Sequence, residues 1–572
     1  MRFYLQKFIV LCISVFVFSI IFLIFYPIFS ANSLIFPYCV HPFDIVNLYP
    51  KTWFYIKICY LITSFICIFL SVNTIVVHFN LFNFSKAIKS VISVNSGDSF
   101  SLCVGKKSHT GESVFISEKG LYQNILITGT IGSGKTSSLM YPLSEQLIKY
   151  DNPKIGMLIL DVKGNFYKQI KNYATNFNRL DDLIILELNS SIKYNPLDKP
   201  HLKPTVLANR LKTILELFSP NSSESYWLDK TEQVLSEAIK LIRLYNNNYV
   251  TFVELHNLIN YDNYYQSKIS VLRNLFLSGK LNKEKIYNLY SALNFFENEF
   301  KSLDSRTISI LKSEITRITG TFISDFDVLN TFCPSKEDIN FYGFKDVLKL
   351  KKIVVLNMNI AKYKNLSKII AAYLKLDFQC EVLSQLEKSS SCIMPSVFIC
   401  DEYHEYVTLS DADFFAQSRE AKSINIVATQ SYTSLLNTLG KESSVKVILQ
   451  NLINKFWLRT DDIFTIESIQ KQIGKEDKTK ISKNISENAG ETNYNFFTNS
   501  LNSKKTSISE SITTHIQTDY IYDTNFFTQN LETFSCLAFL SDGSKILPPC
   551  KLNLIPYFNT FSSNNLSDKK II

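Results

Sequence analysis

The chain has 572 residues, enough for two to four domains, and 46% of them are hydrophobic, enough to form packed cores. Its formal charge of +9 is a mild basic excess, which fits nucleic acid or anionic lipid as partners but singles out neither. The 11 cysteines include no C-x-x-C pair and no Cys/His cluster at metal spacing, which argues against a zinc site or a thiol nucleophile and fits a reduced, cytosolic setting.

Two uncharged, apolar runs lie near the N-terminus, from Phe8 to Phe29 and from Ile58 to Val77. Each has about the twenty residues that are needed to cross a bilayer. The first run is too long for the apolar core of a typical signal peptide, and a second run follows it. We therefore expect residues 1–85 to form a membrane anchor with two transmembrane helices and a short external loop. A cleaved secretory signal and a pair of buried core helices are the alternatives.

The clearest motif follows an apolar, β-branched run that we expect to be a strand, Ile125 to Thr128. It matches the phosphate-binding loop G-x-x-x-x-G-K-[ST], in which glycines let backbone N–H groups converge on phosphate oxygens at the start of a helix. Lys135 would reach the β- and γ-phosphates, and the Thr136 hydroxyl would ligate Mg²⁺. The expected cofactors are ATP and Mg²⁺. The nucleotide-binding residues of the loop are Gly129, Thr130, Gly132, Ser133, Gly134, Lys135, Thr136 and Ser137.

Beyond this loop, apolar runs that we expect to be buried strands alternate with expected helices. These strands are Met157–Leu160, Leu183–Leu188 and Lys352–Asn357. This alternation predicts a parallel, doubly wound sheet with helices on both faces. From 205 to 335 the apolar residues instead recur at three- and four-residue steps, which predicts helices and an all-α domain inserted into the α/β domain. A set of helices that merely cover the sheet is the alternative. The expected domains are an anchor (1–85), a nucleotide-binding domain in two parts (86–204 and 336–560), the all-α domain (205–335) and a tail (561–572).

A second chemical motif is an apolar strand, Ser396–Cys400, that ends in two acids. In a nucleotidase this is the Walker B arrangement, in which Asp401 would hold Mg²⁺ and Glu402 would polarise the attacking water. Asp161 also ends a strand after the phosphate loop, and it is the rival to Asp401. Its claim is weaker because no second acid follows it.

Two further residues are candidates for the chemistry of hydrolysis. An expected strand from Ile424 to Thr429 is followed directly by Gln430. A polar side chain at this position can sense the γ-phosphate. Arg419, in an expected helix from Phe414 to Ala421, could stabilise transition-state charge at the nucleotide of a neighbouring subunit. A surface salt bridge is the alternative role for Arg419.

These motifs occur together in the order found in a known family. The chain resembles the type IV coupling proteins, the TraG/TraD-like ATPases of conjugation and type IV secretion. The resemblance rests on the phosphate loop, Leu160–Gly164, Tyr194–Leu197, Tyr226-Trp227, Phe398–Glu402, Ala428–Ser431, Trp457–Asp462 and Leu537–Gly543. Two features depart from the family pattern. The turn after Asp161 lacks the usual proline and acid, and the Ser-, Asn- and Thr-rich segment from Lys480 to Thr518 has no recognisable cargo motif.

The resemblance implies a RecA-like P-loop ATPase that forms a hexameric ring at the bacterial inner membrane, with its motor domain in the cytosol. It would receive a relaxase–single-stranded DNA complex or a protein effector and pass it to the subunits of a type IV secretion channel. It also places Lys135, Thr136, Asp401 and Glu402 in the ATPase core, Gln430 in the motif that follows, and Arg419 where the family has a proposed arginine finger. An FtsK-like pump for double-stranded DNA and a cargo receptor that binds ATP without hydrolysing it are the alternatives.

Overall fold

The computed structural model divides the chain into two units, Met1–Ser99 and Phe100–Ile572. Among the described residues, no helix is both long enough and apolar enough to cross a membrane. Of the first expected span only Val15 and Phe18 are described, the second is described in part and is helical there, and the expected tail lies outside the described residues, so the spans and the tail stay predictions. Besides a few residues between 15 and 71, the described ranges are 100–218, 225–279, 281–389, 392–488, 492–495, 500–503 and 507–559.

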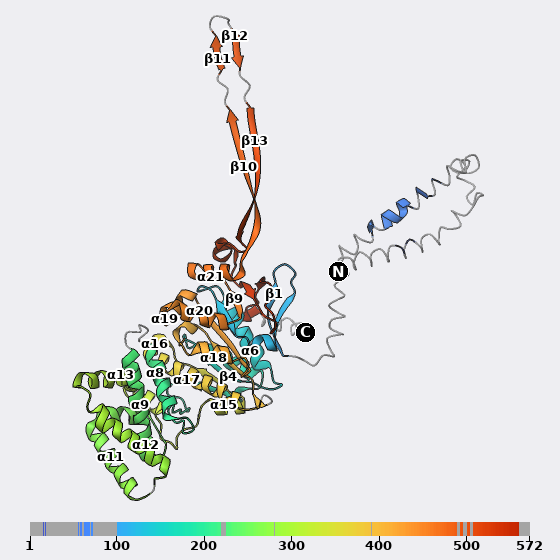
Figure 1. Ribbon diagram of the computed structural model, residues 1–572. Coiled ribbons are helices and arrows are strands. Elements are labelled where there is room, and N and C mark those ends of the chain that lie inside the picture. Colours follow the sequence, from blue (N-terminus) through green and yellow to red (C-terminus); the bar gives the residue numbers. More distant parts are fainter. Residues whose placement is uncertain are drawn as a thin grey trace, which may run out of the picture. The chain divides into compact units, whose positions relative to one another are not determined.

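The second unit is built around an 11-stranded mixed sheet (Figure 1). Its strand order is β2-β1-β15-β14-β9-β3-β8-β7-β4-β6-β5. The strands from β9 to β5 run parallel, as the sequence predicts. The bounds are β1 Ser101–Lys107, β2 Ser113–Ser117, β3 Ile125–Thr128, β4 Gly156–Leu160, β5 Leu183–Leu186, β6 Ile353–Leu356, β7 Ser396–Cys400, β8 Ser423–Thr429, β9 Asn454–Trp457, β14 Ser535–Phe539 and β15 Cys550–Asn553.

The other end of the sheet is antiparallel and differs from the expectation. Strands β14, β15, β1 and β2 continue the sheet beyond β9, each antiparallel to its neighbour. The sequence analysis predicted a parallel sheet and named none of these four strands as part of it. Strands β1, β2 and β15 are only partly buried, so their apolar pattern is weaker than that of the central strands.

Helices cover both faces of the parallel strands. Leu126 and Leu158 point into one hydrophobic cluster, and Ile127 and Ile159 point into the other. This double burial explains why the central strands are apolar throughout rather than alternating. The helices that flank the sheet are α5 Glu118–Leu121, α6 Tyr141–Lys149, α7 Phe166–Asn176, α15 Phe344–Leu350, α16 Ile360–Tyr363, α17 Asn365–Leu383, α18 Asp411–Gln417, α19 Tyr432–Leu439, α20 Glu442–Asn451 and α21 Ile463–Ile473.

Between β5 and α15, the described residues from 204 to 332 are mostly helical, as the sequence predicts. Its buried residues, such as Leu235 and Ile315, belong to the same hydrophobic cluster as Leu356 of the sheet. The structure thus joins this segment to the sheet through one continuous core, and the expected domain boundaries stay predictions. The helices are α8 Pro204–Glu216, α9 Ser225–Tyr245, α10 Phe252–Asn260, α11 Asp262–Leu277, α12 Lys283–Asn294, α13 Ser305–Ile323 and α14 Phe326–Phe332.

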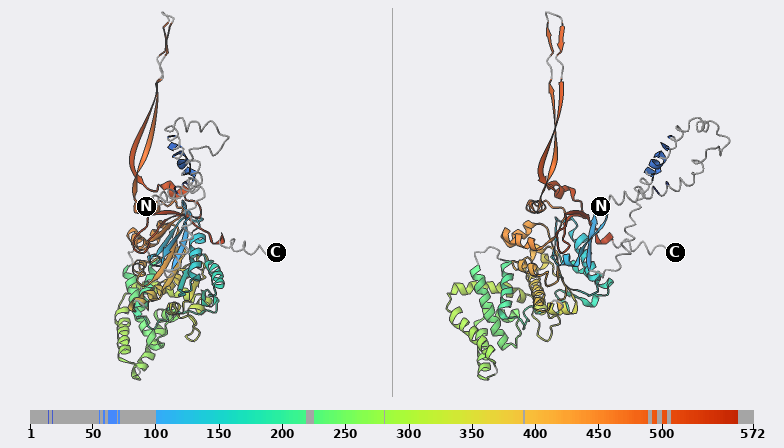
Figure 2. Two further views of the ribbon diagram at one scale, coloured as in Figure 1. Left: turned by 90° about the vertical axis from the view of Figure 1, so that its right-hand side faces the viewer. Right: turned by 45° about the vertical axis from the view of Figure 1, so that its right-hand side comes forward.

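A long β-hairpin follows α21 and is separate from the main sheet. Strand β10, Lys475–Asn488, pairs with β13, Ser507–Tyr520, and the shorter β11, Thr492–Asn495, pairs with β12, Ser500–Ser503. In every view the hairpin and the helices of 204–332 lie on opposite sides of the sheet (Figure 1 and Figure 2). The sequence analysis assigned no structure to this polar segment, because it lacks the apolar alternation that identifies a half-buried strand.

Candidate nucleotide site

The loops after β3, β4, β7 and β8 lie at one edge of the sheet. These strands are parallel neighbours, and the register aligns Thr128 with Thr429 and Leu160 with Cys400, so their carboxyl ends coincide. Open α/β sheets bind their ligands at this edge. A cavity of about 410 Å³ lies here, with the phosphate loop on one side and the two acids after β7 on the other.

The phosphate loop adopts a conformation that requires its glycines. Gly132 and Gly134 have φ angles of 79° and 100°, which side chains with a Cβ rarely adopt. A Cβ at Gly129 would lie 2.8 Å from both the Ser133 hydroxyl and the Leu458 side chain. Six of the eight expected loop residues line the cavity, and Gly129 and Ser133 instead brace the loop from inside.

Lys135 is held within the loop that it belongs to. Its Nζ donates to the carbonyl oxygens of Gly129, at 2.6 Å, and Thr130, at 3.3 Å. Burial lowers the pKa of Lys135, which is partly offset by the nearby charges of Glu402 and Asp401. A buried ammonium that is bound only to carbonyl oxygens is suited to binding an anion in the cavity. The anion would supply the negative charge that neutral carbonyl groups do not have.

Thr136 and Asp401 are in direct contact across the cavity. The Thr136 hydroxyl donates to Oδ2 of Asp401 at 2.9 Å, and the Asp401 backbone N–H donates to the carbonyl of Leu160 at 3.0 Å. Burial, and secondly the charge of Glu402, raises the pKa of Asp401 to about 6. A hydroxyl and a carboxylate oxygen at this spacing form a hard-oxygen donor set that fits Mg²⁺.

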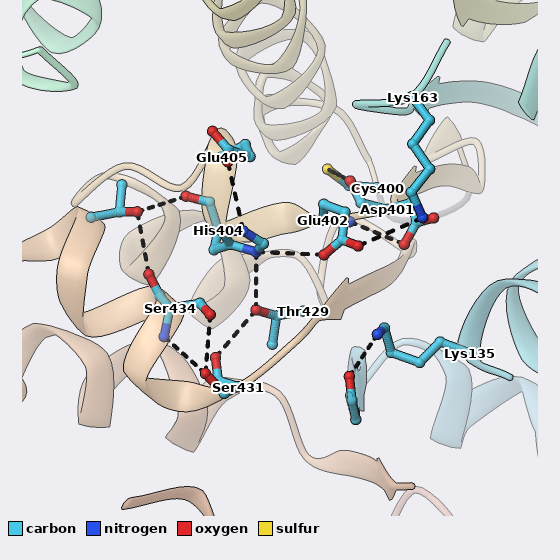
Figure 3. Close-up of polar contacts among 12 residues, drawn as sticks. Lys135, Lys163, Cys400, Asp401, Glu402, His404, Glu405, Thr429, Ser431 and Ser434 are labelled. Carbon is cyan, nitrogen blue, oxygen red and sulfur yellow. Dashed lines mark hydrogen bonds and ion pairs between the residues drawn. The ribbon is translucent and has the colours of Figure 1, made fainter. Parts of the chain in front are cut away.

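Glu402 is buried next to the cavity between two basic side chains (Figure 3). Lys163 Nζ lies 3.8 Å from its Oε1, and His404 Nδ1 lies 3.8 Å from its Oε2. Its backbone is left-handed, with φ of 49°, a conformation that costs about 1–3 kcal/mol for such a residue. Among the described residues, Oε2 has no hydrogen-bond partner. A strained, buried carboxylate with a free acceptor atom is suited to orienting a water molecule.

His404 links Glu402 to the end of β8. Its Nδ1 lies 3.3 Å from the Thr429 hydroxyl, and burial lowers the pKa of His404, which favours the neutral ring. Gln430 directly follows Thr429 and so lies at the same edge of the sheet, but it does not line the cavity. Its role as a γ-phosphate sensor stays a prediction. His404 carries no sequence signal of its own.

Asp161 has a local task that distinguishes it from Asp401. Its carboxylate accepts from three backbone N–H groups, those of Lys163 at 3.0 Å, Asn165 at 2.9 Å and Phe166 at 3.0 Å. It therefore shapes the turn after β4 and caps the start of α7. Asp161 is used within its own loop, which favours Asp401 as the Walker B acid. The same turn presents Lys163 and Asn165 to the cavity, and the sequence analysis assigned neither of them to the site.

Arg419 lies away from this cavity. The expected helix ends earlier, because α18 stops at Gln417, and Arg419 follows it in an exposed turn. Its Nη2 donates to the carbonyl of Gly543 at 3.2 Å. Because Arg419 precedes β8, it lies near the amino end of that strand, opposite the edge that carries the phosphate loop. The structure does not bring it to the site of its own subunit, and a role at a neighbouring subunit stays a prediction.

Comparisons with known proteins bear on this geometry. Residues 395–518 match the family described as TraM recognition site of TraD and TraG. The resemblance to TraG/TraD-like coupling proteins is therefore confirmed. The matched segment begins just before β7, contains Asp401 and Glu402, and extends into β13 of the long hairpin. No curated protein matches the chain in sequence.

Solved structures show the same fold. The bacterial conjugative coupling protein TrwB (TrwBdeltaN70, unbound) is 12% identical, with a TM-score of 0.53 over 81% of this chain and 90% of that one. TrwB with ADP and Mg²⁺ is 11% identical, with a TM-score of 0.51 over 81% and 95%. TrwB with the non-hydrolysable GTP analogue GDPNP is 11% identical, with a TM-score of 0.50 over 81% and 96%. The second unit thus has the mixed α/β fold of this coupling protein.

Proposed function

We propose that the chain is an ATPase of the RecA-like P-loop type that couples substrate transfer to ATP hydrolysis at a type IV secretion or conjugation channel. The contact between Thr136 and Asp401, with Glu402 beside it and Lys135 opposite, carries this proposal. It brings the two halves of a P-loop ATPase site together from segments 265 residues apart in sequence. Structures of TrwB with ADP and Mg²⁺ and with a GTP analogue support nucleotide binding in this fold.

Each residue of the site would have a distinct role in ATP hydrolysis. The backbone N–H groups of the glycine-rich loop and Lys135 would hold the phosphates, and Thr136 and Asp401 would hold Mg²⁺. Bound there, Mg²⁺ would neutralise charge on the phosphate oxygens. Glu402 accepts a hydrogen bond from a water molecule and aligns it for attack on the γ-phosphate. Lys163, which contacts Glu402, adds a second positive charge to the phosphate end of the cavity.

The proposal extends to the membrane and to partners. The two uncharged N-terminal runs support a membrane anchor at the inner membrane, which would place the site in the cytosol. The matched family supports a partner from the complex that processes the transferred DNA, as its description names TraM recognition. The proposal also includes a hexameric ring. An inserted all-α domain would be the first part to bind the cargo, which would be single-stranded DNA, relaxase or effector proteins.

The test is the ATPase rate of the full-length chain in detergent or lipid nanodiscs, with and without single-stranded DNA. Lys135→Ala and Glu402→Gln should each abolish turnover. Glu402→Gln should keep nucleotide affinity, because Glu402 acts on water rather than on the nucleotide. Lys149→Ala, at the exposed end of α6, is the matched control for loss of a lysine.

The outcomes separate the alternatives. Stimulation by DNA that disappears in the two variants and weakens with salt supports a DNA-coupled motor. Turnover that does not respond to DNA supports protein cargo. Nucleotide binding without turnover under any condition overturns the motor and favours a receptor that binds ATP without hydrolysing it.

A further inference from the structure

The antiparallel end of the sheet returns the C-terminal chain to the nucleotide site. Because β14 and β15 are antiparallel to each other and β14 is antiparallel to β9, β14 begins and β15 ends at the edge that carries the phosphate loop. The Leu554 N–H, after β15, donates to the carbonyl of Phe534, before β14, at 2.7 Å. The Phe534 N–H in turn donates to the carbonyl of Ser133, at 3.3 Å. The C-terminal chain is thereby attached to the phosphate loop.

Phe534 makes this attachment in a strained conformation. Its φ of 63° is left-handed, which is unusual for a bulky residue. Its ring packs directly on the phosphate loop, since a Cβ at Gly134 would lie 2.6 Å from the ring. The close approach explains why position 134 has no side chain, in addition to its φ of 100°.

A chain of aromatic rings leads from Phe534 into the cavity. Its ring centroid lies 5.9 Å from that of Phe558, which lies 5.5 Å from Tyr557. Tyr557 contacts Tyr141 edge-on at 5.0 Å, and Tyr141 contacts Phe166 at 4.7 Å. Tyr141, Tyr557 and Phe558, here called the aromatic rim, line the same cavity as Lys135 and Thr136.

The aromatic rim offers a surface on which a flat aromatic ring could stack. Phe558 keeps 49% of its surface exposed although it touches two other aromatic rings. The exposed face of this ring borders the phosphate-binding cavity, where it is available to stack with an aromatic ring of a bound ligand. A nucleotide carries an aromatic base at the far end from its γ-phosphate, and bases stack on aromatic side chains.

We propose that Tyr557 and Phe558 hold the nucleobase of the bound nucleotide by stacking, while Tyr141 fixes the position of Tyr557. This inference rests on the proposed function, in that the cavity binds a nucleotide. Every base presents an aromatic face, so stacking discriminates weakly between adenine and guanine. The C-terminal chain therefore contributes affinity for the nucleoside part, and the phosphate loop contributes affinity for the phosphates.

The test is calorimetric titration of the full-length chain with ADP, GDP and inorganic triphosphate, in the presence of Mg²⁺. In the double variant Tyr557→Ala/Phe558→Ala, affinity for ADP and GDP should fall by on the order of tenfold, as expected for lost stacking. Affinity for inorganic triphosphate, which has no base, should not change. Tyr557→Phe/Phe558→Tyr keeps both rings and should bind as the wild type does. Tyr287→Ala, at an exposed tyrosine of α12, is the control for loss of an aromatic ring.

Other results would overturn the inference in distinguishable ways. Unchanged affinity for ADP in the double variant would show that the rings do not contact the base. An equal loss for ADP and triphosphate would show that the rings support the phosphate loop instead. A wild-type chain that binds neither ADP nor triphosphate would overturn the proposed function and this inference with it.

Discussion

The hydroxyl of Thr136 donates a 2.9 Å hydrogen bond to Oδ2 of Asp401, so the last residue of the phosphate-loop motif touches the first acid after β7. Thr136 begins the helical turn that follows the phosphate loop, and Asp401 directly follows the last residue of β7. The parallel arrangement of β3, β8 and β7 brings them together at the same edge. The contact locates the place where a divalent cation would bind.

Thr136→Ala should impair hydrolysis through Mg²⁺, whereas Thr136→Ser should not. The alanine variant lacks the side-chain oxygen for the ion, so the Mg²⁺ concentration for half-maximal ATPase rate should rise, and the maximal rate should fall on the order of tenfold or more. Serine keeps that oxygen. Phosphate release measured over a series of Mg²⁺ concentrations distinguishes the two variants. An alanine variant with the Mg²⁺ dependence of the wild type would contradict the assignment.

Asp161 and Asp401 should respond in opposite ways to removal of their carboxylates. Asp161→Ala leaves three backbone N–H groups without their acceptor, which should lower the free energy of unfolding by about 1–3 kcal/mol. Asp401→Asn should abolish Mg²⁺-dependent hydrolysis without destabilising the nucleotide-free protein, because burial already disfavours its charge. Urea denaturation and ATPase assays on both variants test this pair. Equal loss of stability in both would refute the distinction.

Arg419→Ala should leave nucleotide binding intact in each subunit but reduce hydrolysis in the assembled protein. The reason is that Arg419 lies near the amino end of β8, away from the site of its own subunit, so we expect it to act at the site of a neighbouring subunit. Mixing Arg419→Ala with Glu402→Gln subunits should restore part of the activity, because some interfaces then combine an intact Arg419 with an intact Glu402. Lys422→Ala, in the same turn, is the control. A mixture without restored activity would indicate that Arg419 only contacts Gly543.

Lys455→Met should stabilise the protein at neutral pH. Lys455 lies on β9 with 4% of its surface exposed, and burial lowers its pKa from 10.5 to about 8. Between these two values the folded protein holds fewer protons at Lys455 than the unfolded chain does, so the free energy of unfolding rises with pH. Below about pH 8 the lysine therefore costs stability, and methionine should recover on the order of 2 kcal/mol at pH 7.

Thermal denaturation at pH 7 and at pH 10 measures this effect. The advantage of Lys455→Met should shrink at the higher pH, where the lysine of the wild type is neutral. Lys446→Met, at an exposed lysine of α20, should show no such pH dependence. An advantage for Lys455→Met that stays equal at both pH values would point to packing rather than charge.

The sequence predicts the parallel part of the sheet well, and the motifs that it singles out meet at one cavity. A phosphate loop and a strand ending in two acids have strong local patterns, and Lys135, Thr136, Asp401 and Glu402 lie together as these patterns indicate. Strand bounds agree within about two residues, because strands buried on both faces form unbroken apolar runs.

The features that the sequence analysis missed depend on contacts between distant segments. Lys163 and His404 are single residues whose importance comes from where their loops lie, next to Glu402. Tyr557 and Phe558 reach the cavity only through the antiparallel strands β14 and β15, more than four hundred residues after the phosphate loop. No local hydrophobic periodicity or motif indicates that the C-terminal chain comes back to the phosphate loop, so this contact is visible only in the tertiary structure.

The pairing of β1 with β15 also sets an order in which the protein can be completed. A hydrogen bond of 2.8 Å joins Ser108 to Asn553, which are 445 residues apart in the chain. During synthesis β1 leaves the ribosome early and has no partner on this side until β15 has emerged. The sheet closes last at the end that carries the aromatic rim. A nascent chain therefore emerges with its phosphate loop long before the aromatic rim that lies next to it, and the proposed base-binding surface can form only after β15 has left the ribosome.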